Sequence, residues 1–463
     1  MNLPLDQFSK ILGDKSVIRN ASEMDAYMKE WRGRVVGKSP CVLLPQTTEQ
    51  VSAIVKICAA QKIALVPQGG NNGLVGAGVP TTDNSMITLS LKRMNKIRVL
   101  DADDFSMIAE AGCILTVAKE AAALQSRLLA MTLASEGSAS IGGLIATNAG
   151  GSYTLRYGNM REQVLGLEAV MADGSVVSEL RSLRKNNSGY DLKQLLIGSE
   201  GTLGIITAAR LKLLPKPNLV EAALVALPDV KSAITALGVL REATADRLSA
   251  FELMPRLAID SAVRFLNKRE PFDKTYPWYA LVETHDSGGS GTLEKALEIL
   301  FGKNLALDAT VAQNQAQHRA FWNLREGIVE AQKSLGASLK HDLAAPVGRI
   351  AELIEKGSAV VEKTIPGTRI YAFGHAGDGN IHFNLSPPEG MSKEAFLAKR
   401  EEMAARLNDL VLALGGSISA EHGIGRFYRD EFLRTGDPLQ IALMRKIKAA
   451  FDPQNILNPG VLL

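Results

Sequence analysis

The sequence predicts an α+β protein with more than one domain. Its 463 residues exceed the size at which a single hydrophobic core usually stops growing. Short apolar runs alternate with helical patterns up to the prolines Pro215 and Pro217. Beyond these prolines, strand and helix patterns follow in the order typical of an antiparallel sheet covered by helices.

The first region begins with a predicted strand at residues 41–44, where the chain is continuously apolar. Thr47 and Gln50 then form a capping box, in which their side chains satisfy amides at a helix start. Apolar residues continue at helical spacing as far as Cys58. Further predicted elements are strands at 62–67 and 86–91, a helix at 116–129 and a hairpin turn at Asp173–Gly174.

The second region predicts an α+β domain. Its apolar and β-branched runs predict strands at 220–227 and 279–283. Helical patterns occupy residues 230–243 and 293–301. A long amphipathic stretch at 314–333 leads into a segment rich in histidine.

The composition excludes several classes of protein. Its 52 basic and 49 acidic residues leave a net charge of +3, without the basic excess that nucleic-acid binding needs. Cys41, Cys58 and Cys113 each lie in an apolar run, which predicts buried free thiols. No apolar run is long enough for a transmembrane segment, and residues 1–20 lack the pattern of a signal peptide. We therefore expect a cytoplasmic protein.

A glycine-rich loop at Pro67–Gly78 directly follows a predicted strand. Glycines let backbone amides point together into a concave anion site, for which a pyrophosphate is a natural ligand. The loop lacks the lysine of a Walker motif, and Val79–Asp83 is a poor helix start, which argues against a Rossmann fingerprint. A flexible surface loop is the alternative, but it would leave apolar Leu74 and Val75 in water.

Two further segments alternate small residues with apolar ones, namely Ser135–Gly151 and Gly198–Ile206. Small side chains allow the backbone to lie close to a large flat ligand. Three such segments within the first domain predict a dinucleotide that lies across the backbone.

These segments resemble the FAD-binding domain of flavoproteins of the vanillyl-alcohol oxidase type. All six histidines lie at position 285 or later, so the resemblance implies non-covalent FAD. It implies a two-part FAD-binding domain at 1–217, an α+β cap domain with an antiparallel sheet at 218–410, and a C-terminal segment at 411–463 that packs back on the FAD domain. The implied FAD-binding residues of these segments and of the chain that follows them are Pro67, Gly69, Gly70, Asn71, Asn72, Gly73, Leu74, Gly76, Gly78, Glu136, Gly137, Ser138, Ile141, Gly142, Gly143, Asn148, Gly150, Gly151, Tyr157, Gly158, Gly201, Gly204, Ile205 and Ile206.

Two histidines flank a Gly-Asp-Gly turn, which predicts a strand, a tight turn and a second strand. His375 and His382 would then meet across the hairpin, where they could present two imidazoles to one cation. Glu421 could complete a His2Glu metal site while the adjacent His422 faces a substrate. A lone histidine is more often a core or surface residue. His285 and His341 have no comparable setting, and we expect His318 to be solvated on a polar helical face.

Arg325 and Lys340 are the basic candidates near this constellation. Arginine suits bidentate binding of a carboxylate, and Arg325 lies on the amphipathic helix predicted at 314–333. Taken without context, each of these residues is more often a surface charge than a substrate ligand.

The segments around His375–His382, Glu421–His422 and Asn458–Gly460 are similar to signatures of the D-2-hydroxyglutarate and D-lactate dehydrogenase group. This resemblance implies that His375, His382 and Glu421 hold Zn²⁺ or another divalent metal and that His422 is the base. It also implies that Asn380, Arg325 and Lys340 bind the substrate and that Asn458 lies near the flavin. Hydroxyglutarate-type members carry threonine four residues after the arginine, where this chain has Val329, so malate-like and lactate-like acids stay open.

The expected reaction is FAD-dependent oxidation of a D-2-hydroxy acid to its 2-oxo acid, with transfer of the C2 hydride to flavin N5. Two alternatives are a metal-dependent hydrolase that uses the same histidines and glutamate, and a non-catalytic flavin subunit. Three scattered cysteines cannot hold an iron–sulfur cluster, so electrons must leave to an external carrier protein, a quinone or O₂. A homodimer is possible.

Overall fold

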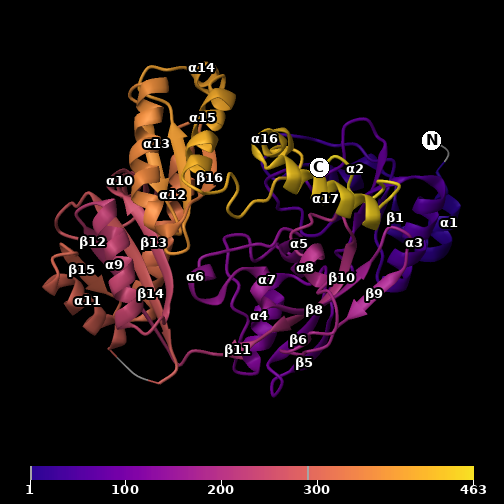
Figure 1. Ribbon diagram of the computed structural model, residues 1–463, viewed down its shortest axis with the longest axis horizontal. Coiled ribbons are helices and arrows are strands. Elements are labelled where there is room, and N and C mark those ends of the chain that lie inside the picture. The colour runs from indigo at the N-terminus through magenta and orange to yellow at the C-terminus, as the bar shows by residue number, and fades with distance from the viewer. Residues whose placement is uncertain (1–2, 289–290) are drawn as a thin grey trace. The chain divides into compact units, whose positions relative to one another are not determined.

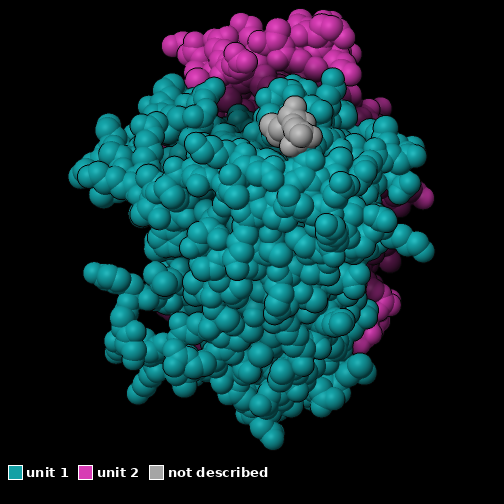
Figure 2. All heavy atoms as spheres, turned by 90° about the vertical axis from the view of Figure 1, so that its right-hand side faces the viewer, with its two compact units in different colours: residues 1–151, 158–216, 421–463 teal, residues 152–157, 217–420 magenta. Residues whose placement is uncertain are grey.

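The structure is a computed structural model that describes residues 3–288 and 291–463. The chain divides into two compact units (Figure 2). Unit 1 comprises residues 1–151, 158–216 and 421–463, and unit 2 comprises residues 152–157 and 217–420. The chain passes from unit 1 to unit 2 after residue 216 and returns to unit 1 after residue 420. The sequence predicts domain boundaries nearby, after residues 217 and 410.

The first sheet of unit 1 contains three parallel strands and one antiparallel edge strand, β1 (Val17–Ile18), which is labelled in Figure 1. The capping box is confirmed, because the Thr47 side chain accepts a hydrogen bond from the Gln50 amide at the start of α3 (Thr48–Gln61). The apolar face of α3 packs in one core with this sheet. Its strands, in spatial order, are β1 (Val17–Ile18), β2 (Val42–Leu43), β4 (Met86–Ser90) and β3 (Ala64–Gln68), and the helices near the N-terminus are α1 (Leu5–Leu12), η1 (Asp14–Ser16) and α2 (Ala21–Met28).

The second sheet of unit 1 is antiparallel. The predicted turn at Asp173–Gly174 is confirmed, since it connects the paired strands β8 and β9. The helix predicted at 116–129 is wrong at its end. Ser126 has a φ of 54°, which cannot continue a helix, and the next residues form β7 (Arg127–Leu128) against β11 (Leu214–Pro215). The spatial order is β5 (Ile97–Asp101), β6 (Ser106–Glu110), β10 (Ile205–Lys212), β8 (Val164–Val170) and β9 (Val176–Glu179), with helices α4 (Leu115–Leu124), α5 (Ile141–Ala146), α7 (Met160–Gln163) and α8 (Lys193–Leu196).

The C-terminal segment from Glu421 belongs to unit 1. It contains α16 (Arg429–Thr435) and α17 (Pro438–Phe451). Ile456 and Leu457 then enter the core of the parallel sheet, where Leu457 forms a parallel bridge with Leu65 of β3. The end of the chain therefore lies beside the strand that leads into the glycine-rich loop.

Unit 2 contains an antiparallel sheet with helices on both faces. Alternate residues of its strands enter different cores, because successive side chains of a strand point to opposite faces. One core includes α9 (Val230–Ala243) and α11 (Thr292–Gly302), and the other includes α10 (Arg256–Leu266) and α12 (Gln315–Lys333). The strands, in spatial order, are β13 (Leu248–Pro255), β14 (Trp278–Asp286), β12 (Leu219–Leu227) and β15 (Asp308–Val311); unit 2 also includes α6 (Thr154–Tyr157).

A second sheet of unit 2 continues from the edge of the first. A bridge between Leu253 and Gly374 joins β13 to the end of β17. One face of this three-stranded sheet is apolar and packs on α13 (Ile350–Thr364) and α15 (Arg400–Ala413). The other face carries the polar side chains of β16 and β18 and, on β17, the buried aromatic residues Tyr371 and Phe373. The spatial order is β16 (Leu339–Ala344), β18 (Asn380–Ser386) and β17 (Arg369–Phe373), and the short helices nearby are η2 (Val347–Arg349) and α14 (Lys393–Leu397).

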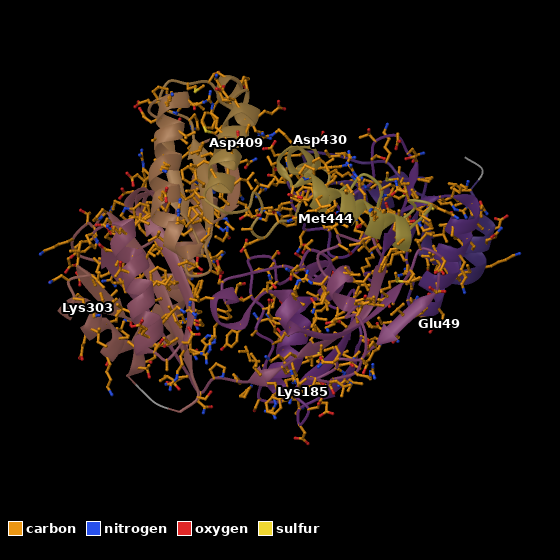
Figure 3. All side chains as sticks on the ribbon, viewed as in Figure 1. Glu49, Lys185, Lys303, Asp409, Asp430 and Met444 are labelled. Carbon is orange, nitrogen blue, oxygen red and sulfur yellow. The ribbon has the colours of Figure 1, made fainter. Side chains whose placement is uncertain are left out.

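Several charged side chains lie on the surface, and the cysteine side chains lie in the interior. Lys185, Lys303 and Asp409 are exposed (Figure 3). All three thiols are buried, which confirms the prediction from their apolar settings. Burial raises the pKa of Cys41 to about 12, of Cys58 to about 12 and of Cys113 to about 11. None of the helices in the described ranges combines the length and the apolar character that a bilayer crossing requires.

Candidate active site

The glycine-rich loop after β3 lies directly against the second glycine-rich segment. A Cβ atom added at Gly69 would lie 2.2 Å from the Ser140 hydroxyl, and one at Gly70 would lie 2.0 Å from the carbonyl oxygen of Ser138. The Gly70 amide donates a hydrogen bond to the Ser140 hydroxyl at 3.2 Å. Only residues without side chains permit this approach, so these glycines bring two of the predicted FAD-binding segments together.

The same two segments also have glycines that face open space, where a ligand could lie close to the backbone. A Cβ atom at Gly73 or Gly137 would meet nothing within 4 Å. No helix follows the loop between residues 69 and 85, which agrees with the exclusion of a Rossmann fingerprint. The glycine-lined surface in unit 1 therefore fits the dinucleotide that the sequence predicts.

The third glycine-rich segment joins the same place. Gly201 has a φ of 74°, and a Cβ atom there would lie 2.6 Å from the side chain of Pro67. The Asn458 side-chain amide donates to the carbonyl oxygens of Ala77 and Glu200, at 3.1 and 2.8 Å. Asn458, predicted near the flavin, thus connects the glycine-rich loop with the third segment.

Some predicted FAD-binding residues lie in the apolar core or make internal bonds. Ile141 and Ile205 are buried with the strands around them. The Asn148 side chain accepts the Arg161 amide at 3.0 Å. Tyr157 belongs to unit 2, where its hydroxyl lies 2.9 Å from Nδ1 of His285. Contact of these residues with FAD stays a prediction.

The predicted histidine hairpin is confirmed. β17 and β18 pair antiparallel, with Phe373 opposite His382, and the Gly-Asp-Gly turn connects them. The rings of His375 and His382 have centroids 5.4 Å apart, and one nitrogen of each lies within 4.8 Å of the other. Two imidazoles at this separation can bind the same divalent cation.

Glu252 on β13 is a buried residue that sequence reasoning missed. Its carboxylate lies 2.5 Å from Nδ1 of His375 and accepts Nε–H of Arg325 at 2.6 Å. Burial favours the neutral acid, but Arg325 and His375 outweigh it and lower the pKa of Glu252 to about 2. The ionised carboxylate fixes the His375 ring so that Nε2 is the nitrogen suited to a metal, as partners of metal-binding histidines commonly do.

Arg325 and Asn380 each present a buried polar atom with no internal partner among residues 3–288 and 291–463. Nη2 of Arg325 has none, although Nε binds Glu252 and the guanidinium lies 5.4 Å from the Phe373 ring centre. Oδ1 of Asn380 has none, although its amide nitrogen donates to Asp342 and to the Leu343 carbonyl. Buried polar groups normally have partners, so an unmatched donor and an unmatched acceptor fit a polar ligand.

Lys340 shares the polar face of this sheet. It lies opposite Asn384 in the pairing of β16 with β18, two pairs beyond Asp342 and His382, and side chains two positions apart on a strand point to the same face. Residues directly opposite in an antiparallel pair share a face, so these four side chains project to the same side. Oδ1 of Asp342 lies 3.6 Å from Nδ1 of His382. The structure therefore gathers His375, His382, Asn380, Arg325 and Lys340 in unit 2.

Glu421 and His422 begin the last segment of unit 1, immediately after the end of unit 2. The preceding amide, of Ala420, donates to the carbonyl oxygen of Asp342 at 3.3 Å. Consecutive Cα atoms are about 3.8 Å apart, so the Cα atom of Glu421 lies at about this distance from that of Ala420. Two imidazoles and a carboxylate are a donor set that suits Zn²⁺.

A second cluster, around the buried carboxylate of Glu283, corrects the expectation that His318 is solvated, because the His318 ring is partly buried and contacts this carboxylate. The Glu283 carboxylate on β14 lies 2.7 Å from Nε2 of His318 and 2.8 Å from Nε2 of His285, and it accepts Nε1–H of Trp322 at 2.7 Å. Burial opposes ionisation, but His285 and His318 outweigh it and lower the pKa of Glu283 to about 2. The cluster anchors the first turns of α12, the helix that carries Arg325. His341 is also buried, with Nδ1 3.0 Å from the Phe383 carbonyl, and burial lowers its pKa to about 4.

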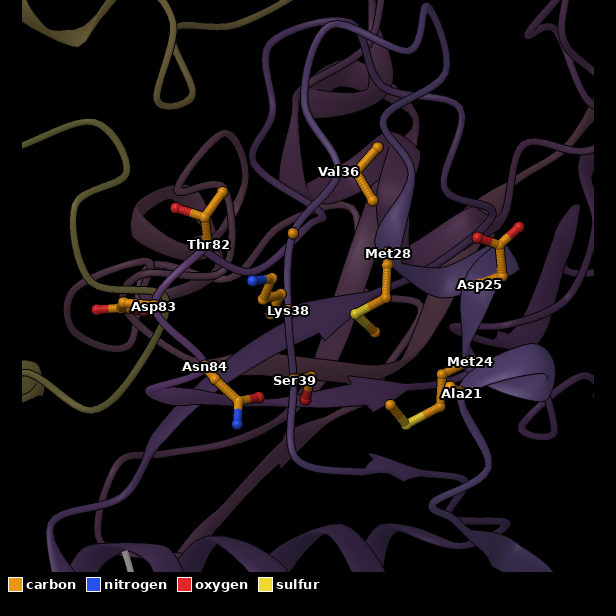
Figure 4. Close-up of a pocket in the computed structure, with 11 residues that line it drawn as sticks. Ala21, Met24, Asp25, Met28, Val36, Lys38, Ser39, Thr82, Asp83 and Asn84 are labelled. Atoms are coloured by element: carbon orange, nitrogen blue, oxygen red, sulfur yellow. The ribbon is translucent and has the colours of Figure 1, made fainter.

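Unit 1 also has an open pocket of about 490 Å³ that no predicted site residue lines (Figure 4). Met24, Met28 and Val36 form apolar parts of its wall, and Asp25 and Lys38 supply charges. Neither histidine nor cysteine lines it. It therefore lacks the groups that the predicted chemistry requires.

Comparison with known proteins defines the class of the protein. Residues 39–179 match the family described as FAD binding domain, and residues 216–462 match FAD linked oxidases, C-terminal domain. A solved structure of p-cresol methylhydroxylase with substrate bound has the same fold, with a TM-score of 0.76 and 20% identity over 98% of this chain and 95% of that chain. These findings define an FAD-linked oxidoreductase with the fold of the vanillyl-alcohol oxidase type.

Two relatives narrow the assignment. The mitochondrial D-2-hydroxyglutarate dehydrogenase of Arabidopsis thaliana is 36% identical over 98% of this chain and 80% of that protein. The D-2-hydroxyglutarate dehydrogenase of Xanthomonas citri pv. viticola is 35% identical over 95% of this chain and 93% of that protein. The chain therefore belongs to the D-2-hydroxyglutarate and D-lactate dehydrogenase group of FAD-dependent dehydrogenases.

Proposed function

We propose that this protein oxidises a D-2-hydroxy acid to the corresponding 2-oxo acid, with D-2-hydroxyglutarate, D-malate and D-lactate as candidate substrates. The observation that carries the proposal is the shared carboxylate of Glu252, which holds His375 and Arg325 in one buried place. A residue suited to binding metal and a residue suited to binding a carboxylate thus lie side by side. The names of the relatives support a hydroxy acid as the substrate class.

FAD, when bound, would accept the C2 hydride of the substrate at N5, and a divalent metal would polarise the α-hydroxyl group. His375, His382 and Glu421 would hold the metal. The guanidinium of Arg325 and the ammonium of Lys340 would bind carboxylate, and the unmatched Oδ1 of Asn380 would accept a hydrogen bond from the substrate.

His422 would remove the hydroxyl proton. A positioned general base contributes on the order of 10²–10⁴ to the rate of such a step. Its neighbour in the sequence, Glu421, would at the same time bind the metal, because adjacent side chains project in different directions. Glu421 would therefore hold the metal that polarises the hydroxyl group, and His422 would take the proton from that group.

Val329 bears on the choice of substrate. It follows Arg325 by one helical turn of α12 and is half-buried. A valine offers no hydrogen bond to a second substrate carboxylate, whereas the threonine of hydroxyglutarate-type members would. Acids with shorter or uncharged side chains therefore stay open beside hydroxyglutarate.

The deciding experiment is anaerobic mixing of the purified holoprotein with a panel of D- and L-2-hydroxy acids while the flavin absorbance is followed. We expect bleaching by one or more D-acids and by no L-acid. A colourless protein would favour a metal-dependent hydrolase, and a flavin that no hydroxy acid reduces would favour a non-catalytic subunit. The match to FAD-linked families supports the dehydrogenase over the hydrolase, and the names of the relatives support it over the non-catalytic subunit.

We further propose a cytoplasmic location and an external electron acceptor, either a carrier protein, a quinone or O₂. The Xanthomonas relative carries no organelle in its name, whereas the Arabidopsis name specifies mitochondria. Rates of reoxidation of the reduced protein by each class of acceptor would distinguish them, and sedimentation would test a homodimer.

A further inference from the structure

Glu200 is a buried acidic residue in an unusual backbone conformation. It lies in the third glycine-rich segment, is 5% exposed and has a φ of 52°. Positive φ is uncommon for residues other than glycine, and it costs free energy that the surrounding structure must offset. Such a strained residue is a reason to look for a function.

The carboxylate of Glu200 holds the turn that follows the predicted base. One oxygen accepts the amide of Ile424 at 2.8 Å, and the other accepts the amide of Gly425 at 2.8 Å. The carbonyl oxygen of Glu200 accepts the side chain of Asn458 at 2.8 Å. All these residues belong to unit 1. Glu200 therefore connects the third glycine-rich segment, in which it lies, with the turn after His422 and with Asn458.

The turn at residues 423–425 has little freedom between its neighbours. A Cβ atom at Gly423 would lie 2.8 Å from Oε1 of Glu200, and one at Gly425 would lie 2.1 Å from the carbonyl oxygen of Val75. Both glycines have positive φ, of 78° and 56°. The carboxylate and the glycine-rich loop thus enclose a turn that begins one residue after His422.

We propose that Glu200 is the positioning residue of the base: its carboxylate fixes the turn at 423–425 and, through it, the direction in which His422 meets the substrate hydroxyl. This inference rests on the proposed function, in which His422 accepts that proton. The alternative is a structural anchor whose loss would destabilise unit 1 without a specific effect on catalysis.

The charge state of Glu200 supports a role beyond packing. Burial raises its pKa to about 7, although the amides of Ile424 and Gly425 oppose the shift. The charged side chains on neighbouring elements have other partners: Arg161 binds Gln194, and Arg426 binds Asn458 and the Pro459 carbonyl. Lys448 binds the Asp452 carboxylate and the carbonyls of Thr202 and Leu457. Because a protonated acid accepts hydrogen bonds more weakly, the two hydrogen bonds from the turn to Glu200 weaken as the pH falls through about 7.

The direct test is amide hydrogen exchange in the holoprotein at Ile424 and Gly425, which needs no substrate. In Glu200→Gln, one amide faces the NH₂ group instead of an acceptor. Loss of a hydrogen bond to a charged group should speed exchange there by about 10–100-fold. Glu168→Gln is the matched control, since Glu168 is also buried in unit 1 and binds Thr48, Thr207 and Arg98 away from this turn. It should leave exchange at both amides unchanged.

The second readout separates positioning from stability. With Glu200→Gln we expect kcat to fall about 10–100-fold, with KM changed less than about threefold and wild-type flavin content, because the base is displaced while binding persists. Glu168→Gln should keep the wild-type kcat. Unchanged exchange in Glu200→Gln, or faster exchange with an unchanged kcat, would overturn the inference.

Two further outcomes are decisive. If Glu200→Gln does not fold, exchange in the wild-type protein at about pH 6 and about pH 8, corrected for the intrinsic rate, takes its place. Opening of the turn while Glu200 stays buried removes the two amides that favour the carboxylate, so the pKa of Glu200 is higher in the open form. Protection at Ile424 and Gly425 should therefore be greater at the higher pH, and equal or lower protection at the higher pH would refute the role of the carboxylate. A wild-type flavin that no D-2-hydroxy acid reduces would instead overturn the proposed function and, with it, the role of His422.

Discussion

Replacement of Glu252 by glutamine tests whether one carboxylate serves both the metal ligand and the substrate ligand. The change keeps the size of the side chain but removes its charge. Its two contacts, 2.5 Å to His375 and 2.6 Å to Arg325, are hydrogen bonds to an ionised group. Glutamine can accept from only one of these donors and turns its NH₂ group toward the other. Removal of one partner of a buried ion pair costs about 3–5 kcal/mol, and loss of a residue that orients a metal ligand weakens metal binding about 10–100-fold.

Metal affinity is measured by competition with a chromophoric chelator, and stability by thermal unfolding of the metal-free protein. Glu283→Gln is the control, because Glu283 is equally buried on the adjacent strand but binds His285, His318 and Trp322 instead of a predicted metal ligand. We expect both variants to lose stability on the order of 3 kcal/mol. Only Glu252→Gln should bind metal more weakly. Equal metal affinities in wild type and Glu252→Gln would refute the reasoning.

Three further predictions follow from single residues. His422→Ala should retain FAD, seen in its visible spectrum, and lose at least about 10²-fold in kcat, whereas wild-type turnover or loss of flavin would contradict the assignment. Val329→Thr should raise kcat/KM for D-2-hydroxyglutarate relative to D-lactate by about tenfold, the worth of one hydrogen bond, and an unchanged ratio would place the second carboxylate elsewhere. The pKa of Glu283 is lowered to about 2, so its contribution to stability is present above the unfolded value near 4.5 and is lost as the pH falls toward 2. Urea titrations should show this acid-induced loss in wild type and a smaller one in Glu283→Gln.

The sequence predicted features that depend on nearby residues. The capping box of α3, the turn at Asp173–Gly174 and the hairpin that joins His375 to His382 each span at most eight positions, so local rules were sufficient. The glycine-rich segments were recognised because the sequence shows directly where glycines cluster and side chains are therefore missing. Their contacts with one another, such as that between Gly69 and Ser140, were not predicted from spacing.

The residues that were missed act across long separations. Glu252 is 123 positions from His375, and Glu200 is 225 positions from Gly425. Each is one acidic residue in an otherwise apolar or glycine-rich stretch, which is the only signal that the sequence offered. His318 was misplaced for the same reason, because its partner Glu283 lies on a strand that a helical pattern cannot reveal.

The three enclosed thiols have a practical consequence for spectroscopy. Only the thiolate reacts readily with alkylating reagents, and proton dissociation from these sulfurs requires strongly alkaline solution. A cysteine introduced on an exposed strand or helix should therefore take up a fluorescent or spin label alone, without prior removal of the native ones. Distances between such labels could then be measured in the otherwise unaltered protein.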